Sequence, residues 1–228
     1  MPISTASNTV TEQLTEAGRA IEHDSFAIID AEAGPHAYTA EQWPLVRRMI
    51  HANADFEFNG LTAFHPGAMQ AGMKAVLKGN TPIVADVEMI CVGLSKPRLA
   101  HFGLTTHHYI SDADVIEAAK AANSTRAVQA MRKAHRLGQL DGAIVGIGNA
   151  PTALIELVRL IREEGVRPAL VIGMPVGFVS AAESKDLLMT VNDVPWVAIK
   201  GRKGGSTLVV AAIHAMLSLA EAEQKKVA

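Results

Sequence analysis

The chain has 228 residues, of which 49% are hydrophobic but only 4% aromatic, and its formal net charge is −2. This near-neutral charge gives no general attraction to nucleic acid or to acidic membranes. The single cysteine, Cys91, excludes an intramolecular disulfide, and we find neither a signal peptide nor an apolar run long enough to span a membrane, so we expect a cytoplasmic protein.

Two regions are expected along the chain. Residues 1–15 are rich in Ser and Thr, and we interpret them as a flexible N-terminal lead-in. Residues 16–228 contain no linker-like stretch and are numerous enough to bury a large core, so we interpret them as a single α/β domain.

The first half of this domain predicts two amphipathic helices and a strand. EQWPLVRRMIHAN places Val46, Met49 and Ile50 on one helical face. The segment Met69–Lys78 repeats the pattern and is followed by Gly79, a residue that commonly ends a helix. PIVADV, which comes next, is typical of a short buried strand.

Three segments of the second half each combine a strand pattern, a glycine-containing loop and a helix pattern. They are GAIVGIGNAPTALIELVRLIREEG, PALVIGMPVGFVSAAESKDLLM and PWVAIKGRKGGSTLVVAAIHAML. This alternation predicts βαβ units and a doubly wound, mainly parallel sheet. In such a sheet the loops that follow the strands meet at one edge, where ligands bind.

The loops GIGNAPT, GMPVGFV and GRKGGST should therefore line one crevice. Glycines let a ligand approach the backbone, and helix N-termini present N–H groups that favour anions. Lys185, Arg202 and Lys203 add positive charge in or just after these loops. For any single loop, tight turns and solvated cations explain the residues equally well. Three such loops at one edge favour a broad anionic ligand.

Several sharper motifs are incomplete. GIGNAP has Pro151 where a dinucleotide fingerprint needs its third glycine, GRKGGST lacks the Walker spacing, and no serine lies in a G-x-S-x-G elbow. His107 and His108, with His101 nearby, lack the spacing of a metal site. We therefore expect neither a metal nor another cofactor, and a nicotinamide-dependent reductase is disfavoured.

His51 lies in RRMIHANADFEF, behind two arginines and ahead of two carboxylates. Taken alone, this stretch favours a structural histidine at the end of an amphipathic helix. The wider sequence changes this interpretation.

The motifs DSFAIIDAEA, RRMIHA, VADVEMICVG, GIGNAPTAL, VIGMPVGFVSAAESK and GRKGGS occur in this order, and together they resemble the precorrin-8X methylmutases, the precorrin isomerases of cobalamin biosynthesis. The resemblance runs from about Ile21 to Leu217. It implies a three-layer α/β/α fold, a homodimer and a cofactor-free reaction that moves a methyl group from C11 to C12 of precorrin-8X, giving hydrogenobyrinic acid. The family's catalytic histidine, in its R-x-I-H-A motif, corresponds to His51.

The expected ligand accounts for the residue types in the loops. A corrinoid precursor carries acetate and propionate arms around an apolar ring, so it needs N–H donors, cations and apolar walls such as Met89 and Phe178. The methyl shift needs one group that gives or takes a proton near neutral pH, and imidazole suits both directions. Of the two arginines before His51, we choose Arg48 over Arg47, because Arg48 lies three residues from His51 on the helix. The expected substrate-binding residues are Ser25, Arg48, Asp86, Met89, Asn149, Thr152, Phe178, Glu183, Lys185, Arg202, Gly204 and Ser206.

Two points stay open at the level of sequence. A non-catalytic tetrapyrrole carrier or scaffold would use the same crevice, and only an enzyme would convert precorrin-8X without additives. The residues also leave open whether the substrate contains cobalt.

Overall fold

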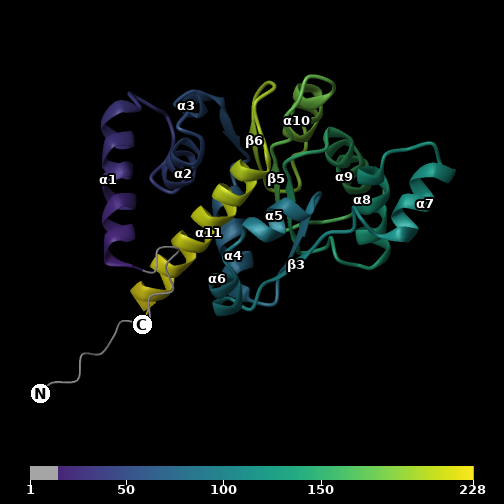
Figure 1. Ribbon diagram of the computed structural model, residues 1–228, viewed down its shortest axis with the longest axis horizontal. Helices are drawn as coiled ribbons and strands as arrows, with labels where there is room; N and C mark the ends of the chain where they lie inside the picture. The colour runs from purple at the N-terminus through teal and green to yellow at the C-terminus, as the bar shows by residue number, and fades with distance from the viewer. Residues whose placement is uncertain (1–14, 228) are drawn as a thin grey trace, which may run out of the picture.

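A computed structural model describes residues 15–227 of the chain (Figure 1). The predicted flexible lead-in therefore lies outside the described residues, apart from Thr15. The Thr15 side chain accepts a hydrogen bond from the backbone N–H of Gly18 at 3.0 Å, and this cap starts α1 (Glu16–Glu32). The first helix thus begins where the predicted domain begins.

A six-stranded sheet in the order β1-β6-β5-β4-β2-β3 forms the centre of the molecule (Figure 1). β1 pairs with β6 in the antiparallel direction, and the other neighbouring strands are parallel, which confirms a mainly parallel sheet. The strands are β1 (Thr62–Phe64), β2 (Pro82–Ala85), β3 (Thr105–His107), β4 (Ile144–Ile147), β5 (Leu170–Gly173) and β6 (Trp196–Ile199).

Helices cover both faces of this sheet, and strand side chains alternate between two apolar cores. In β5, Ile172 packs in the core with α2, α4, α5 and α11, whereas Val171 packs in the core with α8, α9 and α10. α1 lies beside α2 at one end of the molecule, and α7 lies at the other end (Figure 1). The predicted three-layer α/β/α class is confirmed. The remaining helices are α2 (Trp43–Asn53), α3 (Phe58–Leu61), α4 (Ala68–Lys78), α5 (Glu88–Gly93), α6 (Lys96–His101), α7 (Ala113–Ala121), α8 (Arg126–Arg136), α9 (Pro151–Glu163), α10 (Ala181–Met189) and α11 (Ser206–Val227).

The helices and strands predicted from long or strongly apolar patterns are present. The helix predicted over Met69–Lys78 is α4, and Gly79 follows it with a positive φ of 69°. The sequence does not reveal β1 and β3, because strands of three residues carry too little alternation to detect. Backbone pairing with β6 and β2 defines them instead.

α11 corrects one expectation from the sequence. By length and composition, its segment Ser206–Lys226 could cross a membrane, although the sequence pattern suggested no such run. However, 61% of its most apolar window is buried inside the protein, where α11 packs on α2 and α4. The apolar character of α11 is therefore explained by its place in the core.

Candidate active site

The loops after β4, β5 and β6 meet at the carboxyl edge of the sheet, as predicted. The backbone N–H of Val176 donates to the carbonyl of Gly148 at 3.4 Å, and that of Gly177 donates to the carbonyl of Arg202 at 3.2 Å. The loop after β2 joins them through Asp86. We call this region the loop edge, and it comprises residues 86–89, 148–152, 174–180 and 201–206.

Asp86 organises the loop edge from within. Its carboxylate is fully buried and accepts backbone N–H bonds from Gly148, Asn149 and Ala150 at 3.1, 2.9 and 2.7 Å. Burial raises the pKa of Asp86, and the three N–H donors act in the opposite direction. The strand order reverses between β2 and β4, where α/β folds commonly bind an anion at a helix N-terminus. Here the Asp86 carboxylate takes that place, and its predicted contact with a ligand stays a prediction.

Two glycines of the loop edge permit loops to pack on each other. A Cβ atom at Gly204 would lie 2.2 Å from the carbonyl oxygen of Met174, and one at Gly148 would lie 2.6 Å from Cα of Ser206. Ser206 itself is only 8% exposed. At Gly204 the absence of a side chain is thus required by neighbouring backbone, and its contact with a ligand stays a prediction.

Lys185 lies beneath the same loops. Its side chain is fully buried, and its Nζ donates a hydrogen bond to the carbonyl of Lys203 at 2.6 Å. Burial lowers the pKa of Lys185 to about 8, with an opposing effect from the Asp186 carboxylate. This amine supports the loop after β6 from within, and its expected ion pair with a ligand carboxylate stays a prediction.

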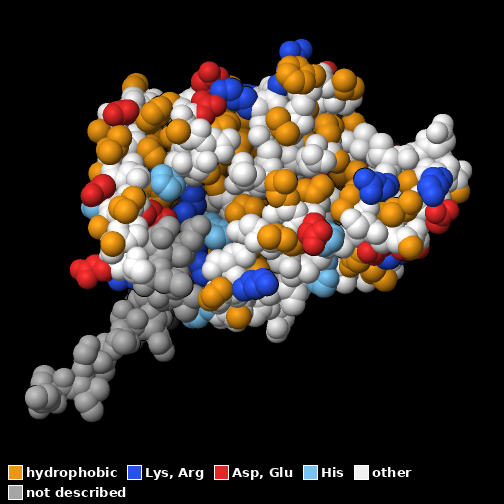
Figure 2. Space-filling model, viewed as in Figure 1, with side chains coloured by type: hydrophobic (Ala, Val, Ile, Leu, Met, Phe, Trp, Pro, Cys, Tyr) orange, Lys and Arg blue, Asp and Glu red, His pale blue; other side chains and the backbone are white. Residues whose placement is uncertain are grey.

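The outer surface of the loop edge is largely apolar. Phe178, Val179 and Met89 are 84%, 82% and 65% exposed. Apolar side chains gather over α5 and near the loops beside α10 on the face that Figure 2 shows. Arg202 is exposed, and its guanidinium carbon lies 5.6 Å from the centroid of the Phe178 ring. Of the predicted contacts, Met89, Phe178 and Arg202 are therefore open to a ligand.

Three further predicted contacts lie at the starts of helices on the other side of the sheet. Asn149 and Glu183 are exposed, just before α9 and in the first turn of α10 respectively. The hydroxyl of Thr152 lies 2.9 Å from that of Thr125, which caps α8. Thr152 thus has a structural partner, whereas Asn149 and Glu183 present their side chains to solvent.

His51 lies in the last turn of α2, with its ring exposed. The Phe26 ring of α1 contacts it edge-on, with 5.3 Å between centroids and an interplanar angle of 72°. Among the described residues the imidazole makes no hydrogen bond, so both ring nitrogens face solvent or a ligand. Phe26 is a neighbour that the sequence pattern did not single out, although it belongs to the DSFAIIDAEA motif.

A groove of about 230 Å³ runs between α1 and α2 at this point. It brings together two predicted site residues, Ser25 and His51. The Ser25 hydroxyl donates to the carbonyl of Ile21 at 2.7 Å, as is common inside a helix. The other residues that line the groove are mostly apolar: Ile28, Ile29, Glu32, Ile50, Ala54 and Phe56.

Arg48 belongs to the interface between α1 and α2. It is 9% exposed and pairs with Glu22 at 2.9 Å. Arg47 pairs with Asp30 at 2.6 Å, and both guanidinium groups lie within 5.5 Å of the Phe26 ring centroid. The choice of Arg48 over Arg47 as a residue that faces the ligand is therefore not supported by this geometry, since both arginines turn towards α1.

The end of α2 also contacts the loop edge. The Thr207 hydroxyl donates to Asn53 Oδ1 at 3.3 Å, and Lys203 Nζ pairs with the carboxylates of Asp55 and Glu57. The segment that directly follows His51 is therefore held against the loops that the second half of the chain supplies. Lys203 was counted only as positive charge in the sequence, and its partners are the two carboxylates that follow His51.

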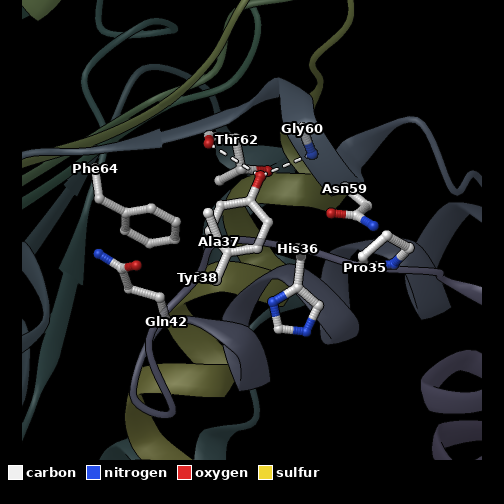
Figure 3. A pocket seen from close by; sticks show the side chains of 9 residues that line it. All are labelled: Pro35, His36, Ala37, Tyr38, Gln42, Asn59, Gly60, Thr62 and Phe64. Carbon is white, nitrogen blue, oxygen red and sulfur yellow. Dashed lines mark hydrogen bonds between the residues drawn. The ribbon is translucent and has the colours of Figure 1, made fainter.

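A second cavity, of about 500 Å³, lies apart from these residues, between the α1–α2 connection and β1. Figure 3 shows the Tyr38 ring at its centre, with its hydroxyl turned towards Gly60 and Thr62. That hydroxyl accepts from the N–H of Gly60 at 2.9 Å and donates to the carbonyl of Thr62 at 3.1 Å. None of the predicted site residues lines this cavity.

Within residues 15–227, no group of three His, Cys, Asp or Glu side chains is placed to hold a metal ion. His107 Nε2 lies 3.1 Å from the Thr105 hydroxyl, and His101 Nε2 lies 3.1 Å from the side-chain oxygen of Gln224. These histidines thus have ordinary polar partners.

The fold and the site together define a doubly wound α/β protein whose apolar loop edge contacts the end of a helix that carries an exposed histidine. The family model described as CbiC, precorrin-8X methylmutase, matches residues 20–219. The chain therefore belongs to the precorrin-8X methylmutase family. It is an isomerase of cobalamin biosynthesis.

Individual relatives agree with this assignment. The chain is 51% identical to the cobalt-precorrin-8 methylmutase of Leptospira interrogans, over 91% of this chain and 96% of that protein. It is 52% identical to the cobalt-precorrin-8 methylmutase of Priestia megaterium, over 91% of each chain. The crystal structure of the precorrin-8X methylmutase from Thermus thermophilus matches with a TM-score of 0.85 at 53% identity, covering 90% of this chain and 97% of that one.

Proposed function

We propose that this chain moves the methyl group from C11 to C12 of precorrin-8X, giving hydrogenobyrinic acid, with His51 as proton donor and acceptor. The observation that supports this role is the exposed His51 ring in the α1–α2 groove, on a helix whose end contacts the loop edge. The edge contact from Phe26 restricts the ring orientation without occupying either nitrogen. Imidazole can then deliver a proton to the macrocycle and take it back as the methyl group migrates.

The substrate-binding residues divide into two groups under this proposal. The exposed side chains contact the substrate directly: Met89 and Phe178 against the ring, Arg202 with a carboxylate arm, and Asn149 as a polar contact. The second group acts through the shape of the loops and comprises Asp86, Lys185, Gly204 and Ser206. Four predicted contacts belong to neither group and stay predictions: Ser25, Arg48, Thr152 and Glu183.

We also propose that the protein is a homodimer and works in the cytoplasm. A groove of about 230 Å³ is smaller than the ~300–1,000 Å³ pockets that enclose drug-sized ligands, so a macrocycle must extend over neighbouring surface. The surface of the loop edge and α5 is unusually apolar, with Phe178, Val179 and Val92 each more than 70% exposed. A second copy of the chain would cover such side chains.

A second candidate function is the same methyl shift on a substrate that contains cobalt. The two relatives at 51% and 52% identity are named for cobalt-precorrin-8, whereas the Thermus protein is named for precorrin-8X. The methyl shift is the same in both cases, and the cobalt ion would belong to the substrate.

One assay tests these proposals. Protein dialysed against a chelator is incubated with metal-free precorrin-8X and, separately, with its cobalt form, and the absorption spectrum is followed over time. Conversion of the metal-free form supports the first proposal, and conversion of the cobalt form alone supports the second. Tight binding of either macrocycle without conversion would identify a carrier instead.

A further inference from the structure

Lys203 connects the loop edge to the end of the helix that carries His51. Its Nζ pairs with the carboxylate of Asp55 and with that of Glu57, the latter at 3.0 Å. Its backbone carbonyl accepts the 2.6 Å hydrogen bond from buried Lys185. The side chain of Lys203 therefore binds the segment that follows α2, while its backbone carbonyl is bound by Lys185 of α10.

The backbone side of this connection is rigid. The N–H of Gly205 donates to the carbonyl of Met174 at 2.8 Å, and Gly204 packs so closely on Met174 that no Cβ atom would fit there. Lys185 is fully buried in α10, beneath the loop. The position of Lys203 is thus fixed relative to β5 and β6.

The turn after α2, on the other side of this connection, depends on contacts outside α2. α2 ends at Asn53, and Ala54 then adopts the left-handed conformation, with φ of 50°. A residue other than glycine rarely adopts this conformation, so tertiary contacts must hold the turn. Those contacts are the two ion pairs of Lys203 and the longer bond of 3.3 Å between Thr207 and Asn53.

Lys203 and Asp55 both stay charged near neutral pH. Pairing with Lys203 lowers the pKa of Asp55, and pairing with Asp55 and Glu57 raises the pKa of Lys203. The ammonium group also lies 5.8 Å from the centroid of the Phe58 ring. Lys203 therefore has several partners on the segment that follows α2.

We propose that Lys203 is a positioning residue: through Asp55 and Glu57 it sets the place of His51 relative to the loop edge, without contacting the substrate. The kinetic part of this proposal rests on the proposed function of His51. A displacement of the reacting group by about 1 Å costs up to roughly a hundredfold in rate. Removal of the lysine charge should therefore lower kcat about ten- to a hundredfold and leave KM nearly unchanged.

The test compares Lys203→Met with Lys203→Arg, Asp55→Asn and the Lys203→Met/Asp55→Asn double variant. Lys120→Met is the matched control, because Lys120 also makes a surface ion pair, with Glu117, but lies on α7 at the far end of the molecule (Figure 1). For each protein, kcat, KM and the melting temperature are measured. The ring signals of ¹³C-labelled histidine are recorded by NMR, and the His51 signal is assigned by its loss in His51→Ala.

Positioning by Lys203 predicts five results. Lys203→Met lowers kcat and shifts the His51 ring signal, Lys203→Arg restores both, and Lys120→Met changes neither. The double variant is no slower than the slower single variant, because both changes break the same contact. All variants melt within a few degrees of the parent protein, since the pairs are partly exposed.

Other results would overturn the proposal. A rise in KM with unchanged kcat would make Lys203 a substrate contact, and additive losses in the double variant would separate it from Asp55. An unmoved His51 signal in Lys203→Met would contradict positioning directly. The NMR comparison needs no turnover, so it tests the positioning of His51 even if the parent protein fails to isomerise precorrin-8X.

Discussion

His51 and Asp86 are polar residues in opposite surroundings. His51 keeps an exposed ring at the end of a helix whose residues Met49 and Ile50 are buried. Asp86 is fully buried, and three backbone N–H groups compensate its carboxylate. An exposed imidazole fits the proposed proton transfer, and the buried carboxylate holds the loop after β4 through its three N–H donors.

We predict that His51→Ala abolishes isomerisation and leaves affinity for the corrinoid product nearly unchanged. Loss of a proton-transfer group typically lowers the rate by roughly 10²–10⁴-fold, while many other side chains share the binding. Turnover is followed by absorption and product affinity by fluorescence quenching. The matched control is His101→Ala, because His101 is an exposed histidine on α6. Near-normal turnover in His51→Ala would return His51 to a structural role.

We predict that Asp86→Asn lowers the free energy of unfolding by about 1–3 kcal/mol. An asparagine keeps one acceptor oxygen and turns its amide N–H groups towards backbone donors, so at least one of the three bonds is lost. Urea denaturation measures the change. Asp114→Asn, at an exposed carboxylate paired with Lys133, should change stability much less. If Asp86→Asn and Asp114→Asn are equally stable, the buried Asp86 carboxylate is dispensable for stability.

At the scale of secondary-structure elements, the loops of this protein are held mainly by groups beneath them. α10 contributes Lys185 to the loop after β6, and the loop after β2 contributes Asp86 to the start of α9. Since these groups are buried, the loops are pre-organised before any ligand arrives. The pKa of Lys185, lowered to about 8 by burial, gives this arrangement a measurable pH dependence.

We predict that the stability difference between the parent protein and Lys185→Met changes with pH. The pKa of Lys185 is about 8 in the folded chain and near its usual 10.5 in the unfolded chain. Between these values the unfolded chain binds more protons, so the parent protein gains stability relative to the variant as pH rises, by up to about 1.4 kcal/mol per pH unit. Urea denaturation of both proteins across this window measures the difference. A constant difference would mean that the burial of Lys185 does not perturb its titration.

Over the whole molecule, two groups of exposed apolar side chains lie near the candidate site. One surrounds the groove beside His51 and includes Ile28 and Phe56, which are 55% and 38% exposed. The other covers the loop edge and α5, where Phe178 and Val92 are 84% and 72% exposed. Contiguous apolar surface of this kind is typical of an interface or of a ligand site.

We predict that the parent protein is a dimer in solution and that Val92→Asp weakens the dimer. A carboxylate at the centre of an apolar interface must be desolvated without a partner, which opposes association. Light scattering over a range of concentrations measures the mass. The control is Leu137→Asp, because Leu137 is 54% exposed but follows α8, away from α5. A monomeric parent protein, or a dimer unaffected by Val92→Asp, would contradict the proposed interface.

Local patterns in the sequence were enough to predict three strand–loop–helix units, those that begin with β4, β5 and β6, and the meeting of their loops at one edge. Local patterns suffice here because periodicity and turn residues act over a few neighbouring positions. The segments around β4, β5 and β6 carry these signals clearly, as does the helix that bears His51. Together with the family motifs, they were enough to predict the class of the fold and the region of the site.

Only the tertiary structure decided which of the predicted polar groups are free to meet a ligand. Asp86 finds its N–H donors 62 to 64 positions further along the chain, and Lys203 finds Asp55 at a separation of 148. Lys185 was expected to pair with a carboxylate of the ligand, and it is buried beneath the loops instead. Burial and pairing depend on neighbours that the fold brings together from distant positions, and the electrostatic role of a charged side chain follows from those neighbours rather than from its local sequence.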